Sequence, residues 1–475
     1  MTQQPRVMQR MIDHIRRIPR EMRPVSAWTV FFLGTFVYVL FSWGQWRQFQ
    51  SPSYDLTIFT QTLQQYAGFD APIVTVKGVG YNILGDHFHP LLILLAPFYA
   101  LAPSAFTLLI LQALLLSASG FFIASAADHR LGRAAGWLVG LAYTFSWGVQ
   151  EAHAVQFHEV AMGALILAIT VWFLSTERWI AASITTGLLV FVKEDLPLTV
   201  VALGVVIAWL SGRWVLGVAV SAWGGLWFLL IMKVLLPALN HENGYDHSDK
   251  IDLAALAADP FAVIAEILTN DAKMGTIWLV LVASAFLVLR SPIGLAVIPT
   301  LAWRFVSTNE GYWGATWHYS LVLMPIMFGA VIDGAARLRG SASTFWRRCG
   351  DVAPAVVLAV AVTLAPNLPM SNLIGPPFWD SDPERTASAR TAVELVGRGN
   401  VVESDVGLMN HLVAGNELYY VGSEENPVPD FIIIDQNRGG WNMEIRLADY
   451  APQIHPDTEW RVIHDEAGIQ VAQRV

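Results

Sequence analysis

Long apolar stretches alternate with short groups of polar residues along most of this chain. About eleven such stretches of roughly 16 to 24 residues lie between Trp28 and Leu368, which is the length that a helix needs to cross a bilayer. The stretch from His89 to Leu101 is shorter and contains Pro97, so we expect an interfacial or re-entrant segment there. The pattern predicts an α-helical polytopic membrane protein.

The composition supports this class of protein. Hydrophobic residues make up 54% of the chain and charged residues only 14%, which is too apolar for a soluble protein of this length. Cys349 is the single cysteine, so the chain forms no internal disulfide and no cysteine-based metal cluster.

The basic residues predict the orientation in the membrane. The region 1–25 carries six arginines. Connections that we assign to the same side hold Arg130, Arg133, Arg178, Arg213, Arg290, Arg337, Arg339, Arg347 and Arg348. Connections on the other side are acidic or mixed, with Asp55, Asp70, Asp86, Glu242, Asp246, Asp249 and Asp271. Positively charged connections stay in the cytoplasm, so we expect a cytoplasmic N-terminus and, after an odd number of spans, an extracytoplasmic C-terminal region.

The sequence divides into three parts. The basic N-terminus 1–25 precedes a transmembrane bundle over 26–369, whose first outer loop covers 46–102. From about Met370 the composition becomes that of a soluble protein, and β-like runs alternate with a helix expected over Ser388–Gly397. We therefore predict a small α/β domain over 370–475 on the outer face.

Five polar groups interrupt the apolar pattern, and the threading places all of them at the outer face. They are Tyr54-Asp55-Leu56, Asp86-His87-Phe88-His89, His158-Glu159, Lys193-Glu194-Asp195 and His318-Tyr319. Ionisable residues at membrane depth usually face a cavity and mark a site. The chain is therefore expected to build a polar site at one end of its helices.

Asp55 is the first acid outside the first apolar stretch. It opens a segment that is expected to be amphipathic, with Ile58, Phe59, Leu63 and Tyr66 on one face, and this would hold the acid over the mouth of the bundle. The alternative is a structural role as an N-cap or first-turn acid of a helix.

The histidines permit several roles. His87 and His89 are two residues apart, which places them on the same side of an extended segment. They could share a divalent metal with His158 or Glu159, since histidine and carboxylate ligands suit Zn or Mn, or they could contact a polar substrate. In the structural alternative, they bond to backbone groups while Asp86 caps the next helix. Glu159 could fix the tautomer of a histidine.

Three cations lie near the outer ends of apolar stretches. Lys193 is pressed between two such stretches, and pairing with the neighbouring acids would explain it structurally. Lys233 and Arg304 lie where the positive-inside bias does not favour them. Snorkelling explains each cation singly, but the three together indicate a place for a phosphate or pyrophosphate at headgroup level.

The polar motifs also carry a resemblance to a known family. Taken in order, YDLxIF at 54–59, GDHFHP at 85–90, FHE at 157–159, VKEDLPL at 192–198 and WHYS at 317–320 resemble an uncharacterised bacterial multi-pass membrane family. This family, a domain of unknown function, is placed with the GT-C glycosyltransferase superfamily. The resemblance runs from about residue 50 to the C-terminus.

The resemblance implies a GT-C-like fold in the bacterial inner membrane. Members of this superfamily move a sugar from a polyprenyl-phosphate carrier to an acceptor on the outer face, here an envelope glycan, lipid or protein. Asp55 matches the acid of the first outer loop and would be the general base, with Asp86 and Glu194 next in line. The carrier and the sugar would contact His87, His89, His158, Glu159, Lys193, Lys233, Arg304, His318 and Tyr319. No cofactor is required, although a divalent metal could bind, and no nucleic-acid partner is expected.

Two other classes of function remain open. The intramembrane charges could form the relay of a transporter for a polar or lipid-linked substrate. The outer domain could instead belong to a non-catalytic envelope scaffold. The gathering of charges at one face favours surface chemistry, because a transporter needs a path across both leaflets.

Overall fold

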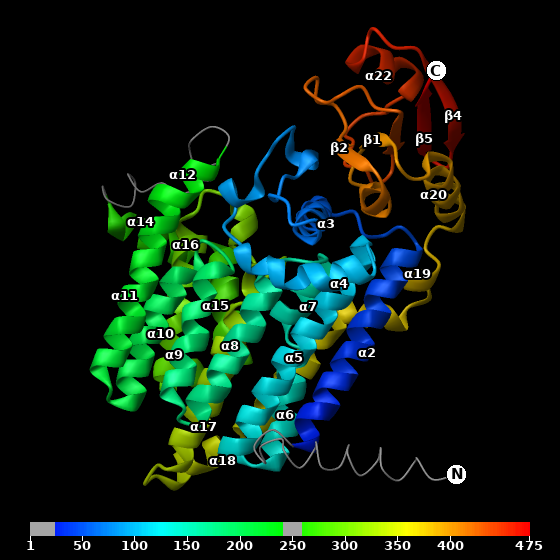
Figure 1. Cartoon of the computed structure of the whole chain (residues 1–475). Helices are drawn as coiled ribbons and strands as arrows, with labels where there is room; N and C mark the ends of the chain where they lie inside the picture. Colours follow the sequence, from blue (N-terminus) through cyan, green and yellow to red (C-terminus); the bar gives the residue numbers. More distant parts are fainter. Residues whose placement is uncertain (1–23, 241–258) are drawn as a thin grey trace, which may run out of the picture.

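A computed structural model describes residues 24–240 and 259–475 of the chain. The basic N-terminus and the acids Glu242, Asp246 and Asp249 therefore lie outside the described residues. The described part consists of a bundle of helices with a small domain at one end (Figure 1).

Helices make up the N-terminal three quarters of the chain. Their bounds are α2 Val25–Arg47, α3 Tyr54–Ala67, α4 Ala96–Leu101, α5 Ala105–Leu131, α6 Arg133–Thr144, α7 Trp147–Ala154, α8 Val160–Ser175, α9 Trp179–Leu188, α10 Leu196–Ser211, α11 Trp214–Leu230, α12 Leu236–Leu239, α14 Pro260–Thr269, α15 Asp271–Ala283, α16 Ile298–Val306, α17 Leu323–Arg339 and α18 Thr344–Leu364.

The prediction of a helical polytopic membrane protein is confirmed. Among the described residues, five helical segments are long and apolar enough to cross a membrane, namely Val25–Arg47, Ala105–Leu131, Trp214–Leu239, His318–Arg339 and Thr344–Asn367. The other apolar helices span 10 to 17 residues. Turns of 3₁₀ helix, such as Leu189–Phe191 and Pro292–Val297, flank several of them. The count of about eleven spans therefore stays a prediction.

Two helices that lead to the polar end pack closely against each other. A Cβ atom on Gly204 of α10 would lie 2.3 Å from Ser221 Oγ of α11, and one on Gly217 would lie 2.5 Å from the Gly204 carbonyl oxygen. Small residues let apolar helices approach in this way within a membrane. The contact aligns the first residues of α10 with the last turns of α11.

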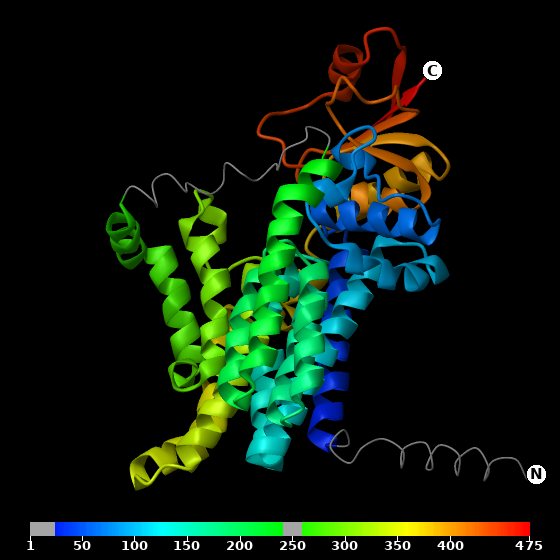
Figure 2. The same ribbon diagram turned by 60° about the vertical axis from the view of Figure 1, so that its left-hand side comes forward.

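The first outer loop lies across the end of the bundle. Figures 1 and 2 both show α3 oriented across the long helices, not along them. The stretch from His89 to Leu101 forms a 3₁₀ turn, Pro90–Leu95, followed by the short α4. In Figure 1, α4 also lies across the bundle, and its interfacial or re-entrant position in the membrane stays a prediction.

The C-terminal region contains a five-stranded sheet and four short helices. The strands are β1 Val401–Ser404, β2 Glu417–Tyr420, β3 Phe431–Asp435, β4 Trp460–Glu466 and β5 Ile469–Arg474, and the helices are α19 Pro376–Trp379, α20 Pro383–Val396, α21 Met409–Leu412 and α22 Leu447–Ile454. The strand order is β2-β1-β3-β5-β4, with parallel pairing on both sides of β1 and antiparallel pairing on both sides of β5. The predicted α/β domain is confirmed, and its first long helix begins five residues before the predicted Ser388, at Pro383.

This domain and the first outer loop share one core. Ile58 of α3 packs with Leu418 and Ile433 of the sheet in a single apolar cluster. Asn410 of the domain donates hydrogen bonds to the carbonyl oxygens of Ser51 (2.7 Å) and Ser53 (2.9 Å), just before α3 begins. The domain therefore holds the start of α3 in place.

The predicted single apolar face of α3 is wrong. Ile58 packs against the C-terminal domain, whereas Phe59, Leu63 and Tyr66 pack in a separate cluster with α4 and α5. The helix is covered on two sides because a domain from the far end of the chain docks on it. A search for one apolar face over the loop could not show this contact.

Candidate functional site

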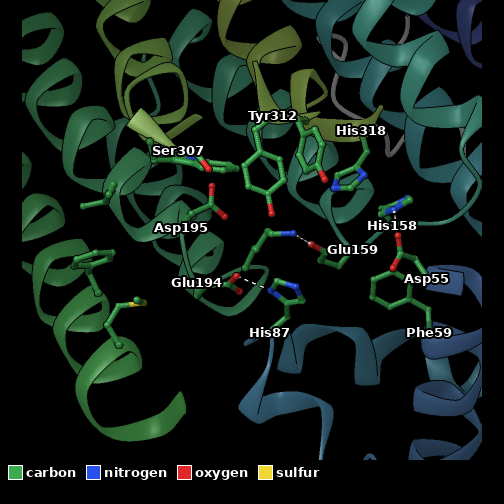
Figure 3. Close-up of a pocket in the computed structure, with 16 residues that line it drawn as sticks. Asp55, Phe59, His87, His158, Glu159, Glu194, Asp195, Ser307, Tyr312 and His318 are labelled. Atoms are coloured by element: carbon green, nitrogen blue, oxygen red, sulfur yellow. Dashed lines mark hydrogen bonds and ion pairs between the residues drawn. The ribbon is translucent and has the colours of Figure 1, made fainter. Parts of the chain in front are cut away.

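A cavity of about 260 Å³ opens where the polar groups meet at the domain end of the bundle (Figure 3). Its lining residues are Asp55, Phe59, His87, His158, Glu159, Lys193, Glu194, Asp195, Leu198, Phe228, Met232, Trp303, Ser307, Tyr312, His318 and Tyr319. All five polar groups of the sequence contribute to the lining. Only Asp55 of the first group and only His87 of the second group reach it. Segments far apart in the sequence thus meet at one site.

Asp55 enters the cavity from the first turn of α3. Ser53 caps this helix by accepting a hydrogen bond from the Leu56 amide, so the side chain of Asp55 does not serve as the N-cap. Its Oδ2 lies 3.2 Å from His158 Nε2, and 53% of the side chain is exposed. Burial would raise the pKa of Asp55, but the hydrogen bond and charge of His158, with His87 and Lys193 nearby, hold it below its usual value.

His158 faces hydrogen-bond acceptors with both ring nitrogens. Nδ1 lies 3.2 Å from the Gln156 carbonyl oxygen, and Nε2 faces the Asp55 carboxylate. A carbonyl oxygen cannot donate, so His158 Nδ1 is the donor in the contact with Gln156. This arrangement keeps Asp55 ionised and oriented.

Strained backbone positions the histidines of the site. The rings of His158 and His318 stack with centroids 3.8 Å apart. Each follows closely on a non-glycine residue with positive φ, namely Gln156 (69°) and Trp317 (67°). Such residues cost free energy and persist only where the surrounding structure enforces them. Here they turn the two loops so that both rings face the cavity.

Gln112 of α5 secures the loop that carries His158. Its amide donates hydrogen bonds to the carbonyl oxygens of Ala152 (3.0 Å) and Gln156 (2.8 Å), and its Oε1 accepts one from the His158 amide (2.8 Å). The side chain is buried. A residue within an apolar helix thus determines where a site histidine lies.

Replacement of Gln112 by alanine should therefore destabilise the protein. The Ala152 carbonyl oxygen and the His158 amide lose their partner, while the Gln156 carbonyl oxygen keeps only His158 Nδ1. Each unsatisfied buried group costs about 1–3 kcal/mol. We expect a lower midpoint of thermal unfolding in detergent, measured by tryptophan fluorescence. Gln64→Ala, at an exposed position of α3, is the matched control and should unfold like the wild type. Equal midpoints for both variants would contradict the role of Gln112.

Two ion pairs order the opposite wall of the cavity. Lys193 Nζ lies 2.5 Å from Glu159 Oε1. His87 Nδ1 lies 2.7 Å from Glu194 Oε1, and the other oxygen of Glu194 accepts the Phe88 amide at 3.2 Å. Lys193 therefore pairs with an acid of another segment, not with its neighbours in sequence. The acid that orients a histidine ring on this wall is Glu194, which contacts His87, and not Glu159 as the sequence suggested.

Several residues expected at the site lie outside the cavity lining. Asp86 is buried and pairs with Lys77 at 2.5 Å. His89 is buried against Phe59. His87 lines the cavity and His89 does not, so the expectation that they lie on the same side of an extended segment is wrong; the chain bends at His87.

Lys233 and Arg304 also lie outside the lining. Lys233 is exposed within a π-helical segment, Ile231–Leu235, at the end of α11. The guanidinium of Arg304 is buried and donates to the carbonyl oxygens of Tyr312 (2.7 Å) and Gly314 (2.6 Å). Arg304 thus holds the loop that brings Tyr312 to the cavity, which differs from the direct phosphate contact expected from the sequence.

The three histidines considered as metal ligands have separate surroundings in this structure. The described residues include no group of three His, Cys, Asp or Glu side chains placed to hold a metal ion. His87 is engaged by Glu194 and His158 by Asp55, while His89 lies apart from the cavity.

An apolar wall completes the cavity, and the sequence analysis missed it. Leu198, Phe228, Met232 and Trp303 come from α10, α11, the π-helical segment and α16. Within apolar stretches these residues resemble any lipid-facing or core residue, so no local signal distinguishes them. The cavity is therefore amphiphilic, with both charged and apolar side chains in its lining.

The fold defines a class of protein, a polytopic membrane protein with an ArnT-like fold. The chain matches two structures of ArnT from Cupriavidus metallidurans, a GT-C glycosyltransferase. The structure bound to undecaprenyl phosphate has a TM-score of 0.51 and 13% identity, covering 94% of this chain and 98% of ArnT. The apo structure has a TM-score of 0.51 and 12% identity, covering 88% and 92%.

The chain belongs to the DUF2079 family of predicted membrane proteins, whose model matches residues 45–471. This confirms the family resemblance seen in the motifs. No curated protein matches the chain.

Proposed function

We propose that this protein is a glycosyltransferase that moves a sugar from a polyprenyl-phosphate carrier to an acceptor in the cell envelope. The observation that carries the proposal is the amphiphilic cavity, in which an ionised and accessible carboxylate faces a lysine and histidines beside an apolar wall. The ArnT complex with undecaprenyl phosphate has the same fold, which supports a lipid phosphate as the ligand.

The proposed reaction is an inverting displacement. The acceptor hydroxyl oxygen forms a bond to the anomeric carbon of the sugar, and the bond from that carbon to the phosphate oxygen breaks. The electron pair leaves with the polyprenyl phosphate, and the hydroxyl proton passes to the Asp55 carboxylate. Lys193 and His87 stabilise the leaving phosphate by charge-assisted hydrogen bonds.

The apolar wall would take the first part of the polyprenyl chain. It is formed by α10, α11 and α16, and α11 is among the most exposed helices of the bundle, with large side chains such as Leu226 and Leu229 facing outward. A carrier in the bilayer could therefore enter from the side of the bundle. Tyr312 and Tyr319 offer aromatic faces for the sugar.

A direct assay tests the proposal. The full-length protein in detergent is incubated with polyprenyl-phosphate sugars and envelope extracts, and released polyprenyl phosphate is measured. Release that depends on both protein and acceptor would support transfer. Failure of every carrier sugar to be consumed would overturn it, and labelled substrate crossing the membrane of proteoliposomes would indicate a transporter instead.

We further propose that the domain end of the bundle is extracytoplasmic in the bacterial inner membrane. The connections that carry Arg130 and Arg339 meet at the opposite end, where Arg339 donates to the Leu131 carbonyl oxygen (2.7 Å) and Arg130 lies 3.6 Å from Glu177 (Figure 1). Basic connections favour the cytoplasm.

Cysteine labelling in intact cells tests this orientation. In a Cys349→Ser background, Glu424→Cys on the C-terminal domain should react with a membrane-impermeant maleimide. Ala342→Cys, between α17 and α18, should react only after lysis. Both positions are exposed, so burial does not confound the comparison. The reverse labelling pattern would invert the orientation.

A further inference from the structure

The charges of the cavity do not match a phosphate ligand if every acid is ionised. The lining holds four carboxyl groups, from Asp55, Glu159, Glu194 and Asp195, but Lys193 is its only lysine or arginine among the described residues. A phosphate would meet net repulsion from these groups. At least one carboxyl group must be protonated, or further positive charge is needed.

Asp195 differs from the other three acids in its contacts. Asp55 faces His158, Glu159 pairs with Lys193, and Glu194 pairs with His87. Asp195 Oδ1 is buried and has no hydrogen-bond partner among the described residues. Asp195 occupies the N-cap position of α10, yet its side chain makes no capping hydrogen bond. An aspartate at this position normally caps the helix, so its carboxyl group is left available to a ligand.

The surroundings of Asp195 favour its neutral form. It lies in the connection between Phe191 and Leu196, directly before α10, which supplies Leu198 to the apolar wall, and Figure 3 shows its carboxyl group below Ser307. Burial raises the pKa of Asp195 to about 6; Lys193 opposes this shift, and Glu194 and Glu159 add to it. The pKa of Asp55 is shifted the other way, and such a separation within one cavity indicates different roles.

We propose that Asp195 binds the carrier phosphate as a neutral carboxylic acid that donates a hydrogen bond to a phosphate oxygen. The identity of the ligand rests on the proposed function. In this arrangement Lys193 supplies charge, Asp195 supplies a proton donor without charge, and Asp55 alone remains a free carboxylate for the acceptor. No proton is transferred from Asp195.

The proposal predicts how carrier binding depends on pH. Lys193, Glu194 and Glu159 lie closest to Asp195, and Asp55, His87, His158, His318, Tyr312 and Tyr319 line the rest of the cavity. Arg304 of the adjacent α16 is directed at loop carbonyl oxygens. Asp195 is protonated below about pH 6, so its contribution is full there and is lost as the pH rises above that value.

The test compares Asp195→Asn with Asp195→Ala. Asparagine keeps a donor and carries no charge at any pH, so it mimics the protonated acid, while alanine removes the donor. The dissociation constant of undecaprenyl phosphate is measured for the full-length protein in detergent at pH 5.5 and pH 8, with undecaprenol as the control without phosphate. Comparing variants at each pH cancels the ionisation of the ligand itself, whose second pKa is about 6.

At pH 5.5 we expect Asp195→Asn to bind like the wild type and Asp195→Ala to bind roughly tenfold more weakly or worse. At pH 8 the wild type must take up a proton on Asp195 in order to bind. Asp195→Asn should therefore bind more tightly than the wild type by about tenfold or more. Undecaprenol binding should not distinguish the three proteins.

Two outcomes would overturn the proposal. Equal weakening by asparagine and alanine would show that the carboxylate is needed, and a loss of wild-type binding with EDTA would then point to a bridging cation. If the ratio of the dissociation constants of the wild type and Asp195→Asn were the same at both pH values, the pH dependence of binding would belong to the histidines. The expected binding pattern without any sugar transfer would refute the proposed function but not this phosphate contact.

Discussion

Replacement of Asp55 by asparagine should lower the rate of sugar transfer by about 10²–10⁴-fold, the usual loss when a positioned general base is removed. Asparagine keeps the size of the side chain and can still hydrogen-bond to His158, but it cannot accept the hydroxyl proton. The measured quantity is the turnover of carrier sugar under saturating conditions. Binding of undecaprenyl phosphate and thermal unfolding should stay near those of the wild type.

The other two candidate bases provide matched controls. Asp86 is buried in its pair with Lys77, and Glu194 holds His87, so neither is free to take a proton from an acceptor. Asp86→Asn should therefore retain turnover if the protein folds. Near-normal turnover in Asp55→Asn, together with a large loss in Asp86→Asn or Glu194→Gln, would move the base to another residue.

The pH dependence of turnover gives a second check on Asp55. The pairing with His158 holds the pKa of Asp55 below its usual value, so the carboxylate is present above that pKa and is lost only as the pH falls through it. Turnover should therefore fall only below about pH 4, which is the ordinary pKa of aspartate. Titration of Asp195 affects carrier binding and should change KM. Titration of Asp55 should change kcat.

Loss of the Lys193 charge should weaken binding of the carrier. Its Nζ is the only lysine or arginine charge that lines the cavity among the described residues, and a charge-assisted hydrogen bond contributes about 1.5–3 kcal/mol. Lys193→Met should raise the dissociation constant of undecaprenyl phosphate by roughly tenfold or more. Because that substitution leaves Glu159 buried without its partner, it should also destabilise the protein by about 3–5 kcal/mol.

The double variant Lys193→Met with Glu159→Gln separates these two effects. It removes both charges of the pair, so much of the stability should return, while carrier binding stays weak. Lys233→Met is the matched control, since Lys233 is exposed and lies outside the cavity lining. Recovery of carrier binding in the double variant, or equal weakening by Lys233→Met, would exclude Lys193 as the phosphate contact.

The sequence predicted which segments carry the site better than it predicted which atoms meet. Each of the five polar groups supplies at least one residue to the cavity, because ionisable side chains at the ends of apolar stretches must face either water or one another. Their pairing depends on the packing of helices that are distant in sequence. Lys193 could have been neutralised by Glu194, yet it meets Glu159, 34 residues away.

Arg304 shows a further limit of the sequence. A lone arginine near the end of an apolar stretch is compatible with a phosphate contact or with a structural role. The structure decides between them, because the guanidinium is surrounded by carbonyl oxygens of the loop that follows α16. Such acceptors belong to the backbone, which leaves no trace in the residue types.

The sequence by itself determined the membrane class, the small α/β domain and the segments that gather charge. These follow from the length of the apolar stretches and from the composition, which act locally along the chain. Only the tertiary structure decided that the C-terminal domain packs on α3, that Asp55 meets His158, and that Asp195 Oδ1 is buried without a hydrogen-bond partner among the described residues. Those features arise from contacts between distant segments, and the protonation of each acid depends on burial and neighbouring charge, which exist only in the folded chain.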